Sequence, residues 1–182
     1  MRNLKLMTLA AATAAFAGLG VLAPAANAGT SATFTVGAGT LTITEPSATA
    51  SFGTPTASPL GTTATGSLGS TTITDGRGSL AGWTLSMAST DFTTTAPVHT
   101  ITASNAVAYL TAVPTVASGV AVVTNTHVLA ASGLTLGNSA AAFMTATTTG
   151  SNTVTFTPTI QVTIPSTAIA GVYNGTVTQT VA

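Results

Sequence analysis

The stretch TVTFTPTIQVTI, residues 153–164, alternates polar and apolar side chains over almost its whole length. Its apolar members fall on one face of an extended chain: Val154, Phe156, Ile160, Val162 and Ile164. A period of two predicts a long β-strand with one buried face and one hydrated face. Pro158 lacks a backbone donor, so we expect an edge, a bulge or a break in this strand at that position.

Weaker copies of the same alternation recur along the chain, separated by Gly, Pro, Ser and Asn. They cover residues 32–36, 41–43, 80–87, 98–102, 120–124 and 172–181. Several short strands with turn residues between them predict an all-β fold, a single β-sandwich or barrel-like domain. Residues 47–69 are rich in Pro, Gly, Ser and Thr and are expected to form a long loop or loosely paired strands. The alanine-rich residues 139–144 are expected to form a short helical turn.

The N-terminus has the features of a secretory signal peptide. A short basic start is followed by an uncharged apolar run over residues 6–22, and Ala26 and Ala28 flank Asn27 as small residues at a cleavage site. We therefore expect residues 1–28 to be removed and residues 29–182 to form the β domain of a secreted protein, with no membrane segment after cleavage. No LPxTG-like motif for covalent wall anchoring is found.

The low charge of the predicted mature chain excludes several classes of function. Its charged residues are Glu45, Asp75, Arg77 and Asp91, so its net charge is −3 + 1 = −2. One arginine is too few for a nucleic-acid-binding patch. Three scattered carboxylates do not form a calcium site, and the absence of cysteine rules out disulfides and thiolate metal sites.

The sequence contains no arrangement of residues typical of an enzyme. The two histidines, His99 and His127, stand 28 positions apart in strand-like or loop-like contexts. No Gly-x-Ser-x-Gly motif, phosphate-binding glycine loop or paired carboxylates are evident. We expect no catalytic residues, no metal and no cofactor.

The single tryptophan, Trp83, lies in an alternating segment in which Leu85 and Met87 share its face. One interpretation places Trp83 in the core of a central strand, because a large aromatic ring fills much of a core that has few aromatic residues. The other exposes the ring for stacking on a sugar. Just upstream, Asp75 and Arg77 flank Gly76, and we expect them to pair across a tight turn.

The segment TDGRGSLAGWTLSMASTDF, residues 74–92, resembles the first motif of the WxL-domain family. Trp83 and Leu85 match its Trp-x-Leu. The C-terminal run over residues 164–181 is similar to the second motif, but Gln179 and Val181 replace the second Trp-x-Leu. The resemblance implies a β-rich protein of Gram-positive cell surfaces that attaches non-covalently to peptidoglycan, with Trp83 and Leu85 as ligand-binding residues.

Two functions therefore remain open. The first is a cell-wall module that binds peptidoglycan or another neutral glycan, or other surface proteins, through hydroxyl-rich strands. The second is a self-associating coat or surface-layer subunit with no dedicated ligand, suggested by the low charge and the many threonine-rich strands. If alternation continues from Tyr173, Gln179 shares a face with Val177 and Val181 and needs a hydrogen-bond partner there or a place at an edge.

Overall fold

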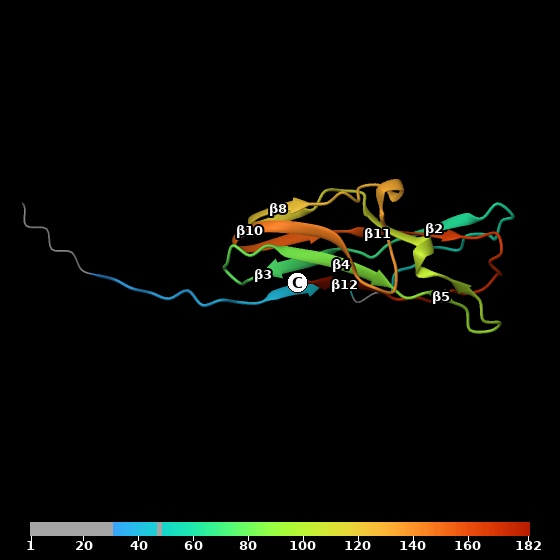
Figure 1. Cartoon of the computed structure of the whole chain (residues 1–182), viewed down its shortest axis with the longest axis horizontal. Coiled ribbons are helices and arrows are strands. Elements are labelled where there is room, and N and C mark those ends of the chain that lie inside the picture. Colours follow the sequence, from blue (N-terminus) through green and yellow to red (C-terminus); the bar gives the residue numbers. More distant parts are fainter. Residues whose placement is uncertain (1–30, 47–48) are drawn as a thin grey trace, which may run out of the picture. The chain divides into compact units, whose positions relative to one another are not determined.

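The computed structural model describes residues 31–46 and 49–182. The predicted signal peptide and its cleavage site lie outside these residues. The chain divides into two compact units, Met1–Thr35 and Val36–Ala182. In the first unit the described residues 31–35 form no strand and are all exposed. The second unit contains the strands described below (Figure 1).

Twelve strands and two short 3-10 turns make up the described part of the chain. The strands are β1 (Leu41–Thr44), β2 (Thr62–Ser67), β3 (Thr71–Asp75), β4 (Trp83–Ser89), β5 (Phe92–Thr93), β6 (Thr100–Ile101), β7 (Ala106–Leu110), β8 (Thr115–Thr124), β9 (Leu134–Thr135), β10 (Ala141–Phe156), β11 (Pro158–Ile164) and β12 (Val177–Val181). The turns are η1 (Ala103–Asn105) and η2 (Ala130–Ser132). The all-β prediction is confirmed.

The largest sheet has the order β1-β3-β10-β4-β12, with β8 added on β10. All its pairings are antiparallel. The first half of β10 pairs with β4 and the second half with β3, while β8 follows both halves. β1 also contacts β12, and the sheet is barrel-like and nearly closed.

A second sheet has the order β2-β11-β7-β9, and β5 and β6 form a small hairpin. Residue Thr157 alone separates β10 from β11, so the chain passes there from the first sheet to the second. One hydrophobic cluster includes buried residues of both sheets, among them Ile73, Leu85, Met87, Ile160 and Val162. Both sheets therefore belong to a single core.

The stretch over residues 153–164 is two strands and not one, and the break expected at Pro158 occurs at Thr157. The alternation survives the break: Val154, Phe156, Ile160 and Val162 are all buried. The same face thus turns inward in both sheets.

Three local predictions are wrong or incomplete. Residues 32–36 form no strand. The helical turn expected over residues 139–144 is the start of β10, because these residues pair with β4 and so gain ladder hydrogen bonds that a lone helical turn lacks. Within residues 47–69, an ordered strand, β2, pairs with β11 after a segment without regular structure.

Candidate functional site

The two residues of the Trp-x-Leu motif lie in the core. Trp83 is 2% exposed and Leu85 is 0% exposed, and Met87 continues the same buried face of β4. The indole Nε1 lies 3.5 Å from Oδ1 of Asn152, which is itself buried. The core interpretation of Trp83 is therefore confirmed. Neither side chain offers a face on which a ligand can stack, so the direct ligand contact inferred from the resemblance does not fit their burial.

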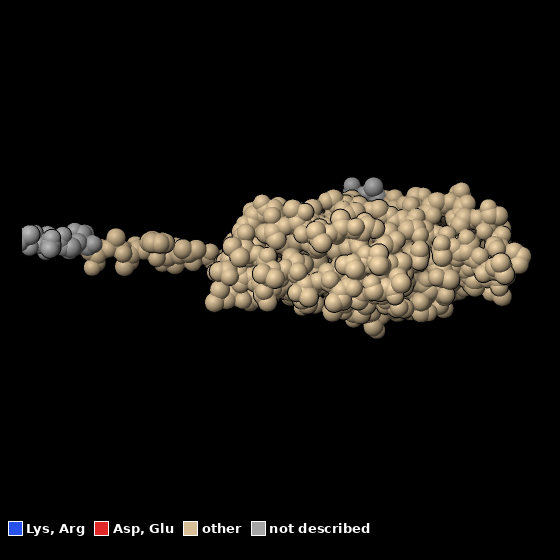
Figure 2. All heavy atoms as spheres, turned by 90° about the horizontal axis from the view of Figure 1, so that it is seen from above, with Lys and Arg blue, Asp and Glu red and all other residues tan. Residues whose placement is uncertain are grey.

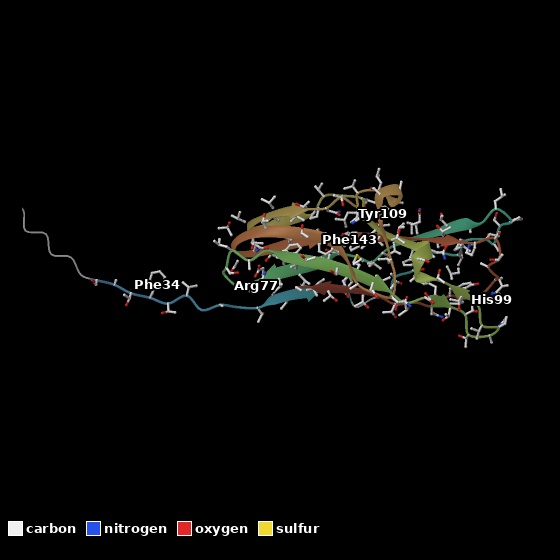
Figure 3. All side chains as sticks on the ribbon, viewed as in Figure 1. Phe34, Arg77, His99, Tyr109 and Phe143 are labelled. Atoms are coloured by element: carbon white, nitrogen blue, oxygen red, sulfur yellow. The ribbon has the colours of Figure 1, made fainter. Side chains whose placement is uncertain are left out.

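A charged pair locks the loop between β3 and β4. Arg77 donates to both carboxylate oxygens of Asp75, each at 2.9 Å, and its Nη2 also donates to the carbonyls of Ala81 and Gly82. The expected pairing across this turn is confirmed. Arg77 closes the loop directly before Trp83 and holds the start of β4 in place (Figure 3).

Asp75 is 1% exposed, and its contacts with Arg77 stabilise the ionised form of its carboxyl group. The side-chain hydrogen bond from Arg77 lowers the pKa of Asp75, against the opposing effect of burial, and the backbone N–H of Arg77 adds a further hydrogen bond. A buried carboxylate that accepts several bonds is a stable anion. The side chain of Asn152 in β10 also lowers the pKa of Asp75 by hydrogen bonding, so the carboxylate links the loop to the first sheet.

Gln179 lies on the inward side of β12 with Val177 and Val181, as the alternation predicts. Its Nε2 donates to Oγ1 of Thr71 at 3.4 Å, while Oε1 is buried without a hydrogen-bond partner among the described residues. Gln179 is thus a partly buried amide with only one of its two polar atoms hydrogen-bonded in the described part of the chain.

The longest unpaired edge in the described chain belongs to β8. This ten-residue strand pairs with β10 on one side, and no described strand pairs with its other side. Val120 and Val122 point outward and are 60% and 65% exposed. Opposite them in β10 stand Thr149 and Thr147. Ala121 and Val123 turn inward and pack against the core.

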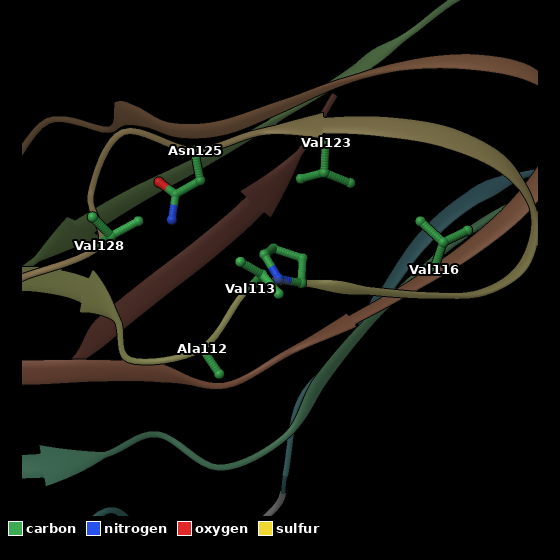
Figure 4. A pocket seen from close by; sticks show the side chains of 7 residues that line it. Ala112, Val113, Val116, Val123, Asn125 and Val128 are labelled. Carbon is green, nitrogen blue, oxygen red and sulfur yellow. The ribbon is translucent and has the colours of Figure 1, made fainter.

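A pocket of about 190 Å³ opens beside β8 (Figure 4). Its lining is almost entirely apolar: Ala112, Val113, Pro114, Val116, Val123, Asn125 and Val128. Val113 is 82% exposed and Val128 is 48% exposed. We call the free side of β8 together with this pocket the β8 edge.

The outer face of the second sheet carries a second surface feature. Tyr109 of β7 is partly exposed and stands opposite Thr159 in β11, whose other neighbour is Ser67 in β2. In the next polar row, Nε2 of Gln161 lies 3.5 Å from Oγ1 of Thr65. We call these five residues the hydroxyl face. It combines one aromatic ring with uncharged hydrogen-bonding groups.

Charged residues are sparse, and one face of the molecule shows none at all (Figure 2). In the described residues, His, Asp and Glu do not form any group of three that can hold a metal ion. His127 makes two contacts within the domain. Its ring stacks on that of Phe143, with the ring centroids 5.5 Å apart, and its Nδ1 lies 2.9 Å from the carbonyl oxygen of Ser132. His99 is exposed on the segment before β6. No helix in the described part of the chain is long and apolar enough to span a membrane.

Comparison with known proteins returned no matching family model, no matching curated protein and no matching solved structure. The resemblance to the WxL-domain family accordingly stays a prediction based on residues 74–92 and 164–181.

Two surface features escaped the sequence analysis. Residues 120–124 were expected to form a strand, but alternation does not reveal that β8 is an edge. The sequence does carry a signal for it: this region has more valines than the single core-facing side of one strand can bury. They are Val113, Val116, Val120 and Val122. Tyr109 stands in the short run AVAYL over residues 106–110, in which both faces are largely apolar and neither is marked as outward.

Proposed function

We propose that the chain is an exported structural protein of the cell wall or cell surface that associates with its neighbours through the β8 edge. The observation that supports this proposal is the ten-residue strand β8, whose one side is unpaired among the described strands and which carries outward valines beside an apolar pocket. Export rests on the signal peptide predicted in residues 1–28.

Free edges are a liability that soluble proteins normally block with lysine, proline or inward charges. Residues 115–124 contain no proline and no charged residue, and no charged residue follows Asp91 in the chain. Apolar side chains that stay exposed beside an open row of backbone donors and acceptors favour the addition of another strand. Exposed valines beside an unprotected strand edge are better explained by contact with another molecule than by a role in the fold of this domain alone.

Sedimentation velocity of residues 29–182 over a wide concentration range tests the proposal. We expect reversible self-association that Val122→Lys weakens strongly, because a charged side chain on an otherwise uncharged edge disfavours pairing with another strand. Leu60→Lys is the matched control, since Leu60 is 97% exposed and lies outside β8. A wild-type protein that stays monomeric at every concentration contradicts the proposal.

A second candidate function, non-covalent binding of a neutral wall glycan, is favoured by the hydroxyl face. Tyr109 supplies an apolar ring, and Thr159, Gln161 and Ser67 supply hydrogen-bonding groups without charge. Binding sites for small polar ligands combine apolar surface with a few placed polar groups in this way.

Pelleting with isolated wall sacculi tests the glycan proposal. We expect Tyr109→Ser to release the protein into the supernatant, while Tyr109→Phe keeps the ring and most of the binding. Equal recovery of wild type and Tyr109→Ser in the pellet contradicts a role for this face. Val122→Lys serves as a second control, because it separates binding to the wall from self-association.

A further inference from the structure

We propose that the strand that pairs with the β8 edge is residues 32–36 of a second copy of this chain. This inference rests on the proposed function and names the partner of the same surface. The segment Ala32-Thr33-Phe34-Thr35-Val36 alternates like the buried strands of the domain. Yet all its residues are exposed and form no strand, with Phe34 at 89% and Val36 at 78% exposure (Figure 3).

The donor and the acceptor match in length and regularity. The downstream half of β8, Val120–Thr124, pairs with β10 in unbroken register over five residues. The donor segment also has five residues, and no described residue hydrogen-bonds to the backbone of residues 32–36. Pairing the two segments satisfies open backbone groups on both.

The two faces of the donor match the two sides of β8. Full overlap of the two five-residue segments would put Phe34 opposite Val122 and therefore outward, whereas a shift of one residue puts Phe34 opposite Val123 or Ala121 and a threonine opposite Val122. In the shifted register Phe34 points inward, lies on the same side as Val123 and faces the pocket of about 190 Å³. An apolar cavity of roughly 150 Å³ accommodates a benzene molecule, so this pocket has room for the phenyl ring. Thr33 and Thr35 then point outward beside Val122 and give the new edge a hydroxylated surface.

Neither partner carries charge that opposes the contact. Residues 31–44 contain no charged side chain, and neither does any position after Asp91. Association therefore needs no buried ion pair and no desolvation of a charged group, and we expect it to depend little on salt concentration.

The connection within one chain is too short for the segment to reach its own β8 edge along the sheet. Leu41 shares a ladder row with Asp75 and, across β10, with Gly119 of β8. In this row β8 is the third strand from β1, so a strand added on the free side of β8 would lie four strand spacings from β1, about 19 Å along the sheet. Five fully extended residue steps from Val36 to Leu41 span about 17 Å. A second copy is not restricted in this way, so the inference places the pairing between molecules.

Site-directed cross-linking tests the partner directly, because the chain contains no cysteine. We expect separately purified Thr35→Cys and Val122→Cys chains, once mixed and oxidised, to form a mixed disulfide between residues 35 and 122, or between 33 and 122 when Thr33→Cys is used. Val123→Cys is the parity control, since its side chain points inward, and it should link at least tenfold less. Absence of the mixed disulfide in a self-associating protein overturns the inference, and so does a double variant that links only within one chain.

Phe34→Ser separates the inference from the proposed function in sedimentation velocity. We expect it to weaken self-association at least tenfold, while Val172→Ser, at a similarly exposed position outside both segments, leaves it unchanged. If Val122→Lys strongly weakens association but Phe34→Ser does not, β8 is an interface and the donor is a different segment. If the wild type never associates, the proposed function and the inference fail together.

Discussion

Replacement of Trp83 by alanine is expected to destabilise the domain strongly. The ring is 2% exposed, and burial of a side chain of this size removes on the order of 200 Å² from water. At about 25 cal/mol per Å² the transfer free energy is about 5 kcal/mol. Alanine retains a small part of this area, and partial collapse of the cavity recovers some more, so we expect a loss of about 4 kcal/mol. This is a large share of the stability of a typical domain.

Urea unfolding followed by far-UV circular dichroism measures this effect, because the variant no longer contains a tryptophan for fluorescence. Leu80→Ala is the matched control: Leu80 is 78% exposed in the loop before β4 and should change stability by less than about 0.5 kcal/mol. In the wild type, the buried indole should resist quenching by acrylamide.

A loss below about 1 kcal/mol for Trp83→Ala would refute the assignment of Trp83 to the core. The most damaging result is a Trp83→Ala protein of wild-type stability that no longer pellets with wall sacculi. Such a result would return Trp83 to a direct role in ligand binding.

Three further substitutions test the interior. Asp75→Asn should cost about 2 kcal/mol at neutral pH, since it removes a charged hydrogen-bond acceptor of Arg77. Because the pKa of Asp75 is lowered by folding, its stabilisation is present above about pH 4 and is lost as the pH falls below that value, so the variant should lose less stability than wild type in acid unfolding. Gln179→Glu should destabilise by about 2 kcal/mol at neutral pH, because it places a charge where Oε1 has no hydrogen-bond partner among the described residues, and thermal unfolding near pH 3 should show a smaller difference. Gly119→Ala should cost at least about 2 kcal/mol in urea unfolding, since Gly119 has φ +70° and a Cβ there meets the carbonyl of Ser151; Gly137→Ala, with open space around it, should be tolerated.

The local pattern of the sequence predicted the strands well and their partners poorly. The alternation around Trp83 identified both the strand β4 and its buried face, and the residues beside Gly76 identified the pair of Asp75 and Arg77. These features depend on neighbours within a few positions. Pro158 predicted a break near this position, but the alternation continues across Thr157 and therefore did not show that the chain changes sheet there.

Whether a strand is central, an edge or unpaired depends on distant parts of the chain. Residues 32–36 alternate like β1, yet only β1 finds a partner in β3. The alanine-rich residues 139–144 favour a helical turn by composition, but pairing with β4 overrides that preference. The two candidate surfaces, the β8 edge and the hydroxyl face, are defined by topology, and for this reason they were absent from the sequence prediction.

Hydrogen exchange of the amides in β8 tests the central claim most directly. The account predicts that peptides covering residues 115–124 exchange rapidly in dilute monomer and gain protection at concentrations where the protein associates, together with residues 32–36. The remaining strands should not change. Association without added protection in β8 would contradict the account, because the interface would then lie elsewhere on the domain.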